Sequence, residues 1–222
     1  MRYDAVLFDF SGTLFGRADG YAWLFPEGET DESIQRAVVD ALRFPGRQLG
    51  SMTGAERECW EFRDLSDEAN RQAYRALFRI AGLECEALFD TVFDRLTDER
   101  HWAAYADTRP TLEHLSRAGL PVGVLSNITW DIRRAFGREE LTPLVDDFVL
   151  SYEVGCCKPE PDIFRTACER LAVPPKRCLL LGDDEVTDGG AVRAGLGFAH
   201  VATGPVGRRP PVLMAALAQH GL

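Results

Sequence analysis

Residues suited to chemistry gather where apolar segments of this chain end. They are Asp9, Ser126, Asn127, Lys158, Asp183, Asp184 and Asp188. An apolar run bounded by turn-forming residues is typical of a strand buried on both faces, and the carboxyl ends of parallel strands meet at one edge of a sheet. Carboxylates gathered there could hold a divalent cation, while a hydroxyl, a backbone amide and a lysine could stabilise an anionic group. This mixture suits chemistry on a phosphoryl group.

Lys158 draws attention for a second reason. Only two of the 25 basic residues are lysine, Lys158 and Lys176, and the others are arginine. In a chain that otherwise uses arginine, each lysine is worth considering as a residue with a specific role. Taken one at a time, Ser126, Lys158 and the Asp183-Asp184 pair are ordinary loop residues. Their order along the chain gives them weight.

The elements that must position these residues alternate between strands and helices. Strands are predicted at 5–8, 121–125, 147–150, 177–181 and 198–201, with helices at 110–118, 161–171 and 212–219. Strands separated by helices form a parallel sheet with right-handed crossovers. We therefore expect an α/β protein with a Rossmann-like parallel sheet. Residues 1–14 and 104–222 form this core.

The segment between the first strand and residue 108 does not share this alternation. Thr53 and Glu56 have the spacing of a capping box, and Ser66 can cap the next helix. Apolar residues from Leu88 to Leu96 recur at helical spacing and indicate an amphipathic helix. Residues 15–103 are therefore predicted to be an inserted all-helical domain.

Composition limits the classes of partner. The formal net charge is −10, which argues against nucleic acid or an anionic membrane as the main partner. No apolar run has the length of a membrane-spanning helix, and residues 1–4 show no signal-peptide pattern. The six cysteines form no C-x-x-C pair, which is typical of reduced thiols. We expect a cytoplasmic protein that acts on a small molecule.

The ordered motifs resemble those of the haloacid dehalogenase (HAD) superfamily over essentially the whole chain. The matching segments are Asp9-Phe10-Ser11-Gly12-Thr13-Leu14, Ser126 after its strand, Lys158-Pro159 followed by Pro161-Asp162-Ile163-Phe164, and Gly182-Asp183-Asp184 with Asp188. The helical insertion is similar to the C1-type cap of that family. The resemblance implies a hydrolase that requires Mg²⁺ and acts on a small phosphorylated substrate.

The resemblance also implies roles for individual residues. Asp9 would be the nucleophile that forms an aspartyl-phosphate, and Lys158 would bind the transferring group and restrain Asp9. Phosphate would be bound by Ser126, Asn127, Lys158, Gly12 and Thr13, with Thr13 also bonding its own turn. Mg²⁺ would be held by Asp9, the backbone carbonyl of Ser11, Asp183, and Asp184 or Asp188. His101, His114, His200 and His220 fit no motif.

Ser11 departs from the pattern of the phosphatases in this family, which carry a second aspartate there as general acid and base. A backbone carbonyl at this position survives any side chain, so metal binding is expected to persist. Serine is a poor acid at ordinary pH, and a positioned acid contributes about 10²- to 10⁴-fold in rate. Ser11 is therefore the position that decides what kind of enzyme this is.

Other members of the family suggest alternatives. A phosphonatase would need a cap lysine, and residues 15–103 contain none. A haloacid dehalogenase needs no metal and no acidic cluster. The presence of Asp183, Asp184 and Asp188 therefore argues against a dehalogenase. A catalytically impaired binding or regulatory protein, and a phosphotransferase with a persistent aspartyl-phosphate, remain open. Candidate substrate contacts from the insertion are Arg17, Tyr21, Trp23 and Arg47.

Overall fold

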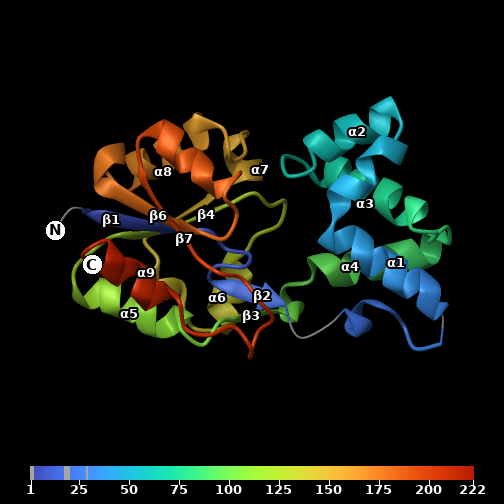
Figure 1. Ribbon diagram of the computed structural model, residues 1–222, viewed down its shortest axis with the longest axis horizontal. Helices are drawn as coiled ribbons and strands as arrows, with labels where there is room; N and C mark the ends of the chain where they lie inside the picture. The colour runs from blue at the N-terminus through green and yellow to red at the C-terminus, as the bar shows by residue number, and fades with distance from the viewer. Residues whose placement is uncertain (1–2, 18–20, 29) are drawn as a thin grey trace. The chain divides into compact units, whose positions relative to one another are not determined.

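The computed structural model describes residues 3–17, 21–28 and 30–222. It divides the chain into two units, Met1–Asp19 with Trp102–Leu222, and Gly20–His101 (Figure 1). Within the described residues, no helix combines the length and the apolar character needed to cross a membrane.

The first unit is an α/β core built on a parallel sheet of five strands. The strand order is β5-β4-β1-β6-β7, with bounds β1 Ala5–Phe8, β4 Val122–Ser126, β5 Asp147–Leu150, β6 Cys178–Gly182 and β7 Gly197–His200. β1 is central, and Phe8 pairs with Val124 on one side and Leu181 on the other. The predicted parallel sheet is therefore confirmed.

Alternate residues of β1 enter two different apolar cores. Val6 and Phe8 pack in the core that contains Leu112 and Leu217, whereas Leu7 packs with Phe164 on the opposite face. The sheet accordingly carries α5 (Thr108–Arg117) and α9 (Leu213–Gln219) on one face and α8 (Pro161–Arg170) on the other (Figure 1). A strand buried on both faces explains why residues 5–8 are uniformly apolar.

Shorter elements complete the core unit. They are α6 Arg133–Arg138, α7 Ser151–Val154, and the 3-10 turns η5 Thr142–Leu144, η6 Pro175–Arg177 and η7 Asp188–Ala194. Two further strands, β2 (Phe15–Arg17) and β3 (Trp102–Ala104), pair antiparallel. The sequence predicts residues 15–17 and 102–103 to lie in the insertion, whereas in the structure they group with the first unit, and Phe15 and Trp102 lie in its apolar core. The cause is local, because Phe15 stacks on the core residue Phe10 with ring centroids 5.0 Å apart.

The second unit is entirely helical in its described residues. Its elements are η1 Ala22–Leu24, α1 Glu32–Arg43, η2 Pro45–Arg47, η3 Leu49–Ser51, α2 Gly54–Glu61, α3 Asp67–Ile80, α4 Glu86–Thr97 and η4 Glu99–His101. Thr53 and Glu56 form the predicted capping box at the start of α2, and Ser66 caps α3. Phe78, Phe89 and Val92 lie in this unit's own apolar core. The predicted helical insertion is thus present.

Candidate active site

The carboxyl ends of three neighbouring strands bring together the residues that the sequence singles out. Asp9 follows β1, Ser126 ends β4, and Asp183 follows β6. The Asp9 N–H donates to the Leu181 carbonyl at 2.9 Å, so the Asp9 backbone stays attached to the edge of the sheet. The rigid strands thus fix where the Asp9 carboxylate stands.

Lys158 lies at the centre of this group. Its Nζ donates to Asp9 Oδ1 at 2.6 Å, to Asp188 Oδ1 at 2.6 Å and to the Leu125 carbonyl at 3.2 Å. The residue is only 4% exposed. A buried ammonium group uses its three donors on three acceptors here, which is the condition for tolerating a charge away from water.

Asp9, Asp183 and Asp188 form a compact cluster of carboxylates. One ligand oxygen from each lies within 4.8 Å of the other two. Burial raises the pKa of Asp9 to about 7 against the pull of Lys158, and the charges of Asp188 and Asp183 act in the same direction as burial. Burial, reinforced by the Asp188 charge, raises the pKa of Asp183 to about 6.

These pKa shifts have a chemical meaning. Three carboxylates around one ammonium group leave an excess of negative charge in a space with little water. A divalent cation with hard oxygen ligands would relieve that excess, and carboxylate oxygens are the donors that Mg²⁺ prefers. The residues present therefore fit such a cation.

Asp184 does not belong to the cluster, although the sequence offered it as an alternative to Asp188. Its carboxylate accepts hydrogen bonds from the backbone N–H groups of Val186 and Thr187, both at 2.8 Å. Although partial burial acts to raise it, these hydrogen bonds lower the pKa of Asp184 below its ordinary value. Asp184 shapes the turn before η7, and Asp188 is the acid that this turn brings to Lys158.

Asn127 follows β4, as predicted, and its side chain contacts the backbone of Lys158. Its side-chain amide donates to the Lys158 carbonyl at 2.8 Å and accepts from the Lys158 N–H at 2.8 Å. Both ends of the amide thus hold the backbone that carries Lys158. The second N–H of the amide is still available, so a phosphate contact from Asn127 stays a prediction. Ser126, one residue earlier, is 2% exposed at the end of β4.

The turn after Asp9 places three consecutive residues differently. Ser11 is exposed. Gly12 has a φ of +86°, and a Cβ there would lie 2.2 Å from Asp183 Oδ2, so only glycine fits. Thr13 is fully buried, and its hydroxyl has no hydrogen-bond partner within the described part of the chain. The structure shows no hydrogen bond from the Thr13 hydroxyl within its turn, and the role of Thr13 in phosphate binding stays a prediction.

Gly182 explains why a glycine precedes the acidic segment. A Cβ at this position would lie 2.4 Å from Asp188 Cγ. The Asp188 carboxylate therefore packs directly against the backbone at the end of β6, and any side chain at 182 would push it away from Lys158.

Sequence reasoning missed two residues next to the site. Arg209 donates to the carbonyls of Gly12 and Thr13, at 3.2 Å and 2.8 Å. His200 Nε2 lies 3.0 Å from the Asp183 carbonyl oxygen. Neither residue stands in a local pattern, because Arg209 lies in a Gly- and Pro-rich segment and His200 at the end of β7.

Of the candidate substrate contacts, Tyr21 and Trp23 stack on each other with ring centroids 6.4 Å apart. In the core unit, the Arg17 guanidinium lies 4.5 Å from the Trp102 ring centroid. In the helical unit, Trp23 stacks on His101 at 4.0 Å, and Arg47 pairs with Asp40 at 3.3 Å. Tyr21 alone of the four lines a pocket among those described.

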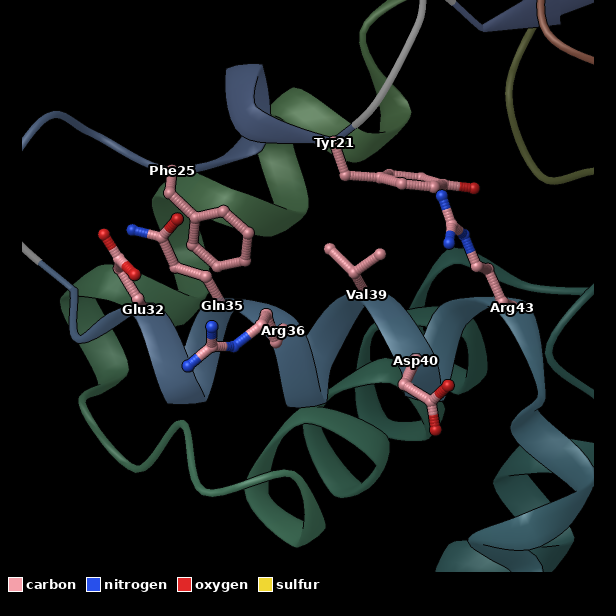
Figure 2. A pocket seen from close by; sticks show the side chains of 8 residues that line it. All are labelled: Tyr21, Phe25, Glu32, Gln35, Arg36, Val39, Asp40 and Arg43. Atoms are coloured by element: carbon pink, nitrogen blue, oxygen red, sulfur yellow. The ribbon is translucent and has the colours of Figure 1, made fainter.

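That pocket has a volume of about 420 Å³ and lies along α1. Figure 2 shows Tyr21 beside Arg43 at one end, with Glu32 and Gln35 at the other. The Arg43 guanidinium lies 5.6 Å from the Tyr21 ring centroid. The lining includes two acids and two arginines, so the pocket carries no strong net charge.

Comparison with known proteins identifies the class. The family described as haloacid dehalogenase-like hydrolase matches residues 3–195, and the chain belongs to that family. Its relatives include phosphatases and dehalogenases. A crystal structure of a HAD phosphatase from Thermococcus onnurineus has the same fold, with a TM-score of 0.62, 22% identity and 98% of each chain covered.

Two curated relatives illustrate both activities. Phosphatase MT3486 of Mycobacterium tuberculosis is 37% identical over 36% of this chain and 37% of its own length. The (S)-2-haloacid dehalogenase 4A of Burkholderia cepacia is 31% identical over 49% of this chain and 48% of its own length. The chain thus spans less than half the length of either relative. Both alignments support a hydrolase of the HAD family.

Proposed function

We propose that this HAD hydrolase is a Mg²⁺-dependent phosphatase that acts on a small phosphorylated metabolite, with Asp9 as nucleophile. The observation that carries the proposal is the cluster of Asp9, Asp183 and Asp188 around Lys158. A dehalogenase acting on an organic halide has no need for two extra carboxylates beside its nucleophile. A phosphatase that binds a divalent cation does need them.

The proposed reaction has two steps. An Asp9 carboxylate oxygen attacks phosphorus, the bond from phosphorus to the ester oxygen breaks, and the leaving alkoxide takes up a proton. Water then attacks the phosphorus of the aspartyl-phosphate, which releases inorganic phosphate and restores the Asp9 carboxylate. Covalent catalysis of this kind replaces one difficult displacement by two easier ones.

The chain's own residues have separate roles in this scheme. Lys158 holds Asp9 Oδ1 in place and offers positive charge to the phosphoryl group. The Ser126 hydroxyl and neighbouring backbone N–H groups bind the phosphoryl oxygens. Asp9, Asp183, Asp188 and the Ser11 carbonyl would hold the metal. When bound, Mg²⁺ supplies charge that neutralises the phosphoryl oxygens.

The helical unit, Gly20–His101, is proposed to act as a C1-type cap that selects the substrate. The support is its position in the sequence, between the nucleophile motif and the remaining motifs, together with its separate apolar core. Tyr21 is the candidate contact to test first, because it lines a pocket of that unit.

The test of the function uses purified protein and two substrates. With 4-nitrophenyl phosphate, whose leaving group needs little protonation, we expect turnover that requires Mg²⁺ and stops with EDTA. With 2-chloropropionate we expect no chloride release, with or without metal. Chloride release without phosphatase activity would show that the protein is a dehalogenase and not a phosphatase.

Ser11→Asp should create the missing general acid. We expect a gain of about tenfold or more on alkyl phosphates, because a positioned acid is worth about 10²- to 10⁴-fold and a new one is imperfectly placed. The rate on 4-nitrophenyl phosphate is the internal control and should change much less. Equal changes on both substrates, or a loss on both, would show that Ser11 has its own role.

Ser11 also favours a second candidate function. Without an acid and base at this position, the aspartyl-phosphate would be hydrolysed slowly, and an acceptor alcohol could compete with water for it. Added glycerol or another small alcohol should then increase release of 4-nitrophenolate relative to inorganic phosphate. A constant ratio of one would exclude this transfer under those conditions.

Metal binding should stabilise the protein in a pH-dependent manner. Asp9 and Asp183 have a raised pKa in the folded state, about 7 and about 6, so the folded protein binds protons more tightly than the unfolded chain. Stability without metal is therefore expected to fall as pH rises from about 4 through 7. Mg²⁺ competes with these protons, so saturating Mg²⁺ should raise the Tm by about 5 °C or more at pH 8 and much less at pH 5.

Asp183→Asn is the matched control for this measurement, because it removes a proposed ligand without changing the size of the side chain. It should abolish most of the Mg²⁺-dependent rise in Tm at pH 8. A rise that is equal at both pH values, or one that survives this substitution, would place the metal elsewhere.

A further inference from the structure

The turn that follows the nucleophile is held by residues from two distant parts of the chain. Arg209 Nη1 donates to the carbonyls of Gly12 and Thr13, at 3.2 Å and 2.8 Å. The next carbonyl, that of Leu14, accepts from the Tyr105 N–H at 3.0 Å and the Thr108 hydroxyl at 2.6 Å. Three successive carbonyls of the turn thus have donors from outside it.

Arg209 is itself held firmly. Its Nη2 donates to Asp107 Oδ1 at 2.5 Å, and its guanidinium lies 3.5 Å from the Tyr105 ring centroid. Asp107 Oδ2 in turn accepts from the backbone N–H groups of Val212 and Leu213, at 2.7 Å and 3.0 Å. The Arg209 side chain is 1% exposed. A buried charge with a carboxylate partner and a ring beneath it has little freedom to move.

The turn contacts the carboxylate cluster directly. Gly12 packs so closely on Asp183 that a Cβ at position 12 would overlap the carboxylate. Ser11, whose carbonyl is a proposed metal ligand, is the preceding residue. A shift of this turn would therefore move Asp183 and the Ser11 carbonyl together.

We propose that Arg209, paired with Asp107, is a positioning residue that fixes the turn at Gly12 and Thr13 and thereby sets the geometry of the metal ligands. This inference rests on the proposed function of the Asp9 site. It takes the turn-holding role that the motif suggests for Thr13 and gives it to a residue nearly 200 positions later in the chain.

Arginine suits this role for a geometric reason. The guanidinium is planar and carries five N–H donors, so one side chain can serve two carbonyls and a carboxylate at once. Lysine has the same charge but places its donors on a single nitrogen. Arg209→Lys should therefore keep the pairing with Asp107 and lose part of the hold on the turn.

The test compares Arg209→Gln, Arg209→Lys and Asp107→Asn with wild type in two measurements. The first is hydrogen exchange of the Gly12, Leu14 and Phe15 amides, which donate within the turn to Phe15 O and Phe10 O. The second is the Mg²⁺ concentration at half saturation, from calorimetry and from turnover. For Arg209→Gln we expect the exchange rates of these amides and the half-saturating Mg²⁺ concentration each to increase about tenfold or more. Arg209→Lys and Asp107→Asn should give intermediate values.

Leu115→Ala is the control for lost stability. Leu115 is fully buried in α5 and belongs to the apolar core that also contains Leu14 and Phe15, but its side chain has no donor for the carbonyls of the turn. All variants are measured well below their unfolding temperatures. If Arg209→Gln matches Leu115→Ala in either measurement, Arg209 only stabilises the fold and the inference is overturned.

The role of Arg209 and the phosphatase activity can fail separately in these measurements. An inactive wild type that still binds Mg²⁺ would count against the phosphatase, while exchange and calorimetry would still decide the role of Arg209. A wild type that binds no Mg²⁺ would overturn both, because the inference requires the turn to position metal ligands. Arg209→Lys is the milder variant that keeps the test usable if Arg209→Gln fails to fold.

Discussion

Asparagine at position 9 will leave a protein that folds but does not hydrolyse phosphate esters. The side chain keeps its size, but an amide oxygen cannot act as the nucleophile in this reaction. We expect the rate on 4-nitrophenyl phosphate with Mg²⁺ to fall by about 10³-fold or more, the scale seen when a nucleophile is removed. Steady-state kinetics on purified protein gives this number.

The same substitution should not lower stability in the absence of metal. Asp9 shares a buried space with Asp188 and Asp183, and burial raises the pKa of Asp9 to about 7. Removing one of these carboxylates at pH 8 relieves repulsion, while Lys158 keeps Asp188 as its partner at 2.6 Å. We therefore expect a Tm equal to or above that of wild type without Mg²⁺, as is common when a catalytic residue is strained.

Asp4→Asn is the matched control. Asp4 lies just before β1, whereas Asp9 lies just after it. The Asp4 carboxylate is near the surface and accepts a hydrogen bond from Arg177 Nε at 2.6 Å. This substitution should leave turnover within about twofold of wild type, because surface pairs contribute little. If Asp9→Asn keeps substantial activity, or if Asp4→Asn loses as much, then Asp9 is not the nucleophile.

Methionine at position 158 should cost both activity and stability. Lys158 is the cation that contacts Asp9 and Asp188, and removal of one partner from a buried charge group typically costs about 3–5 kcal/mol. For a chain of this length that corresponds to a Tm lower by about 10 °C or more at pH 8. Turnover should fall by about 10²-fold or more, since Asp9 would lose its restraint and the phosphoryl group a positive charge.

The loss of stability in Lys158→Met should depend on pH. Burial raises the pKa of Asp9 to about 7 against the charge of Lys158, so without Lys158 the Asp9 carboxylate takes up a proton more readily. The stability deficit of Lys158→Met should therefore shrink as pH falls from 8 to 5. Thermal unfolding at both pH values measures it.

The chain supplies its own control in Lys176, its other lysine, which is exposed in η6. Lys176→Met should change neither turnover nor Tm appreciably. A Lys158→Met deficit that is the same at pH 5 and pH 8 would show that the ammonium group is not compensating these carboxylates.

The sequence predicted the elements that have strong local signals. A run of buried residues such as 5–8 can only be a central strand in this pattern, and the Thr53 capping box marks the start of α2 unambiguously. The alternation of strands and helices then brings Asp9, Lys158 and Asp183 to one edge of the sheet. Their convergence follows from topology, which local patterns determine.

The features that sequence reasoning missed depend on geometry between distant segments. β2 and β3 are three residues each and pair across most of the insertion, so neither has a periodic pattern. Asp184 and Asp188 cannot be told apart from the sequence alone. Only the path of the turn decides that Asp184 accepts from backbone N–H groups of the turn while Asp188 contacts Lys158. Arg209 is one of many arginines, and nothing in its neighbourhood distinguishes a buried one from an exposed one.

Ser11 connects these observations to the chemistry. The cluster provides a nucleophile, a cation to hold it and carboxylates for a metal, but the side chain at position 11 cannot donate a proton efficiently. We therefore expect an aspartyl-phosphate that forms readily with good leaving groups and persists longer than in a phosphatase that carries aspartate there.

Trapping this phosphoenzyme would show directly whether Asp9 is the nucleophile. The protein is mixed with 4-nitrophenyl phosphate and Mg²⁺, quenched in acid within one turnover, reduced with borohydride and digested for mass spectrometry. We predict that Asp9 is reduced to homoserine, that this requires both substrate and Mg²⁺, and that it is absent from Asp9→Asn. Turnover of the ester with Asp9 unmodified, or with the modification on another residue, would show that Asp9 is not the nucleophile.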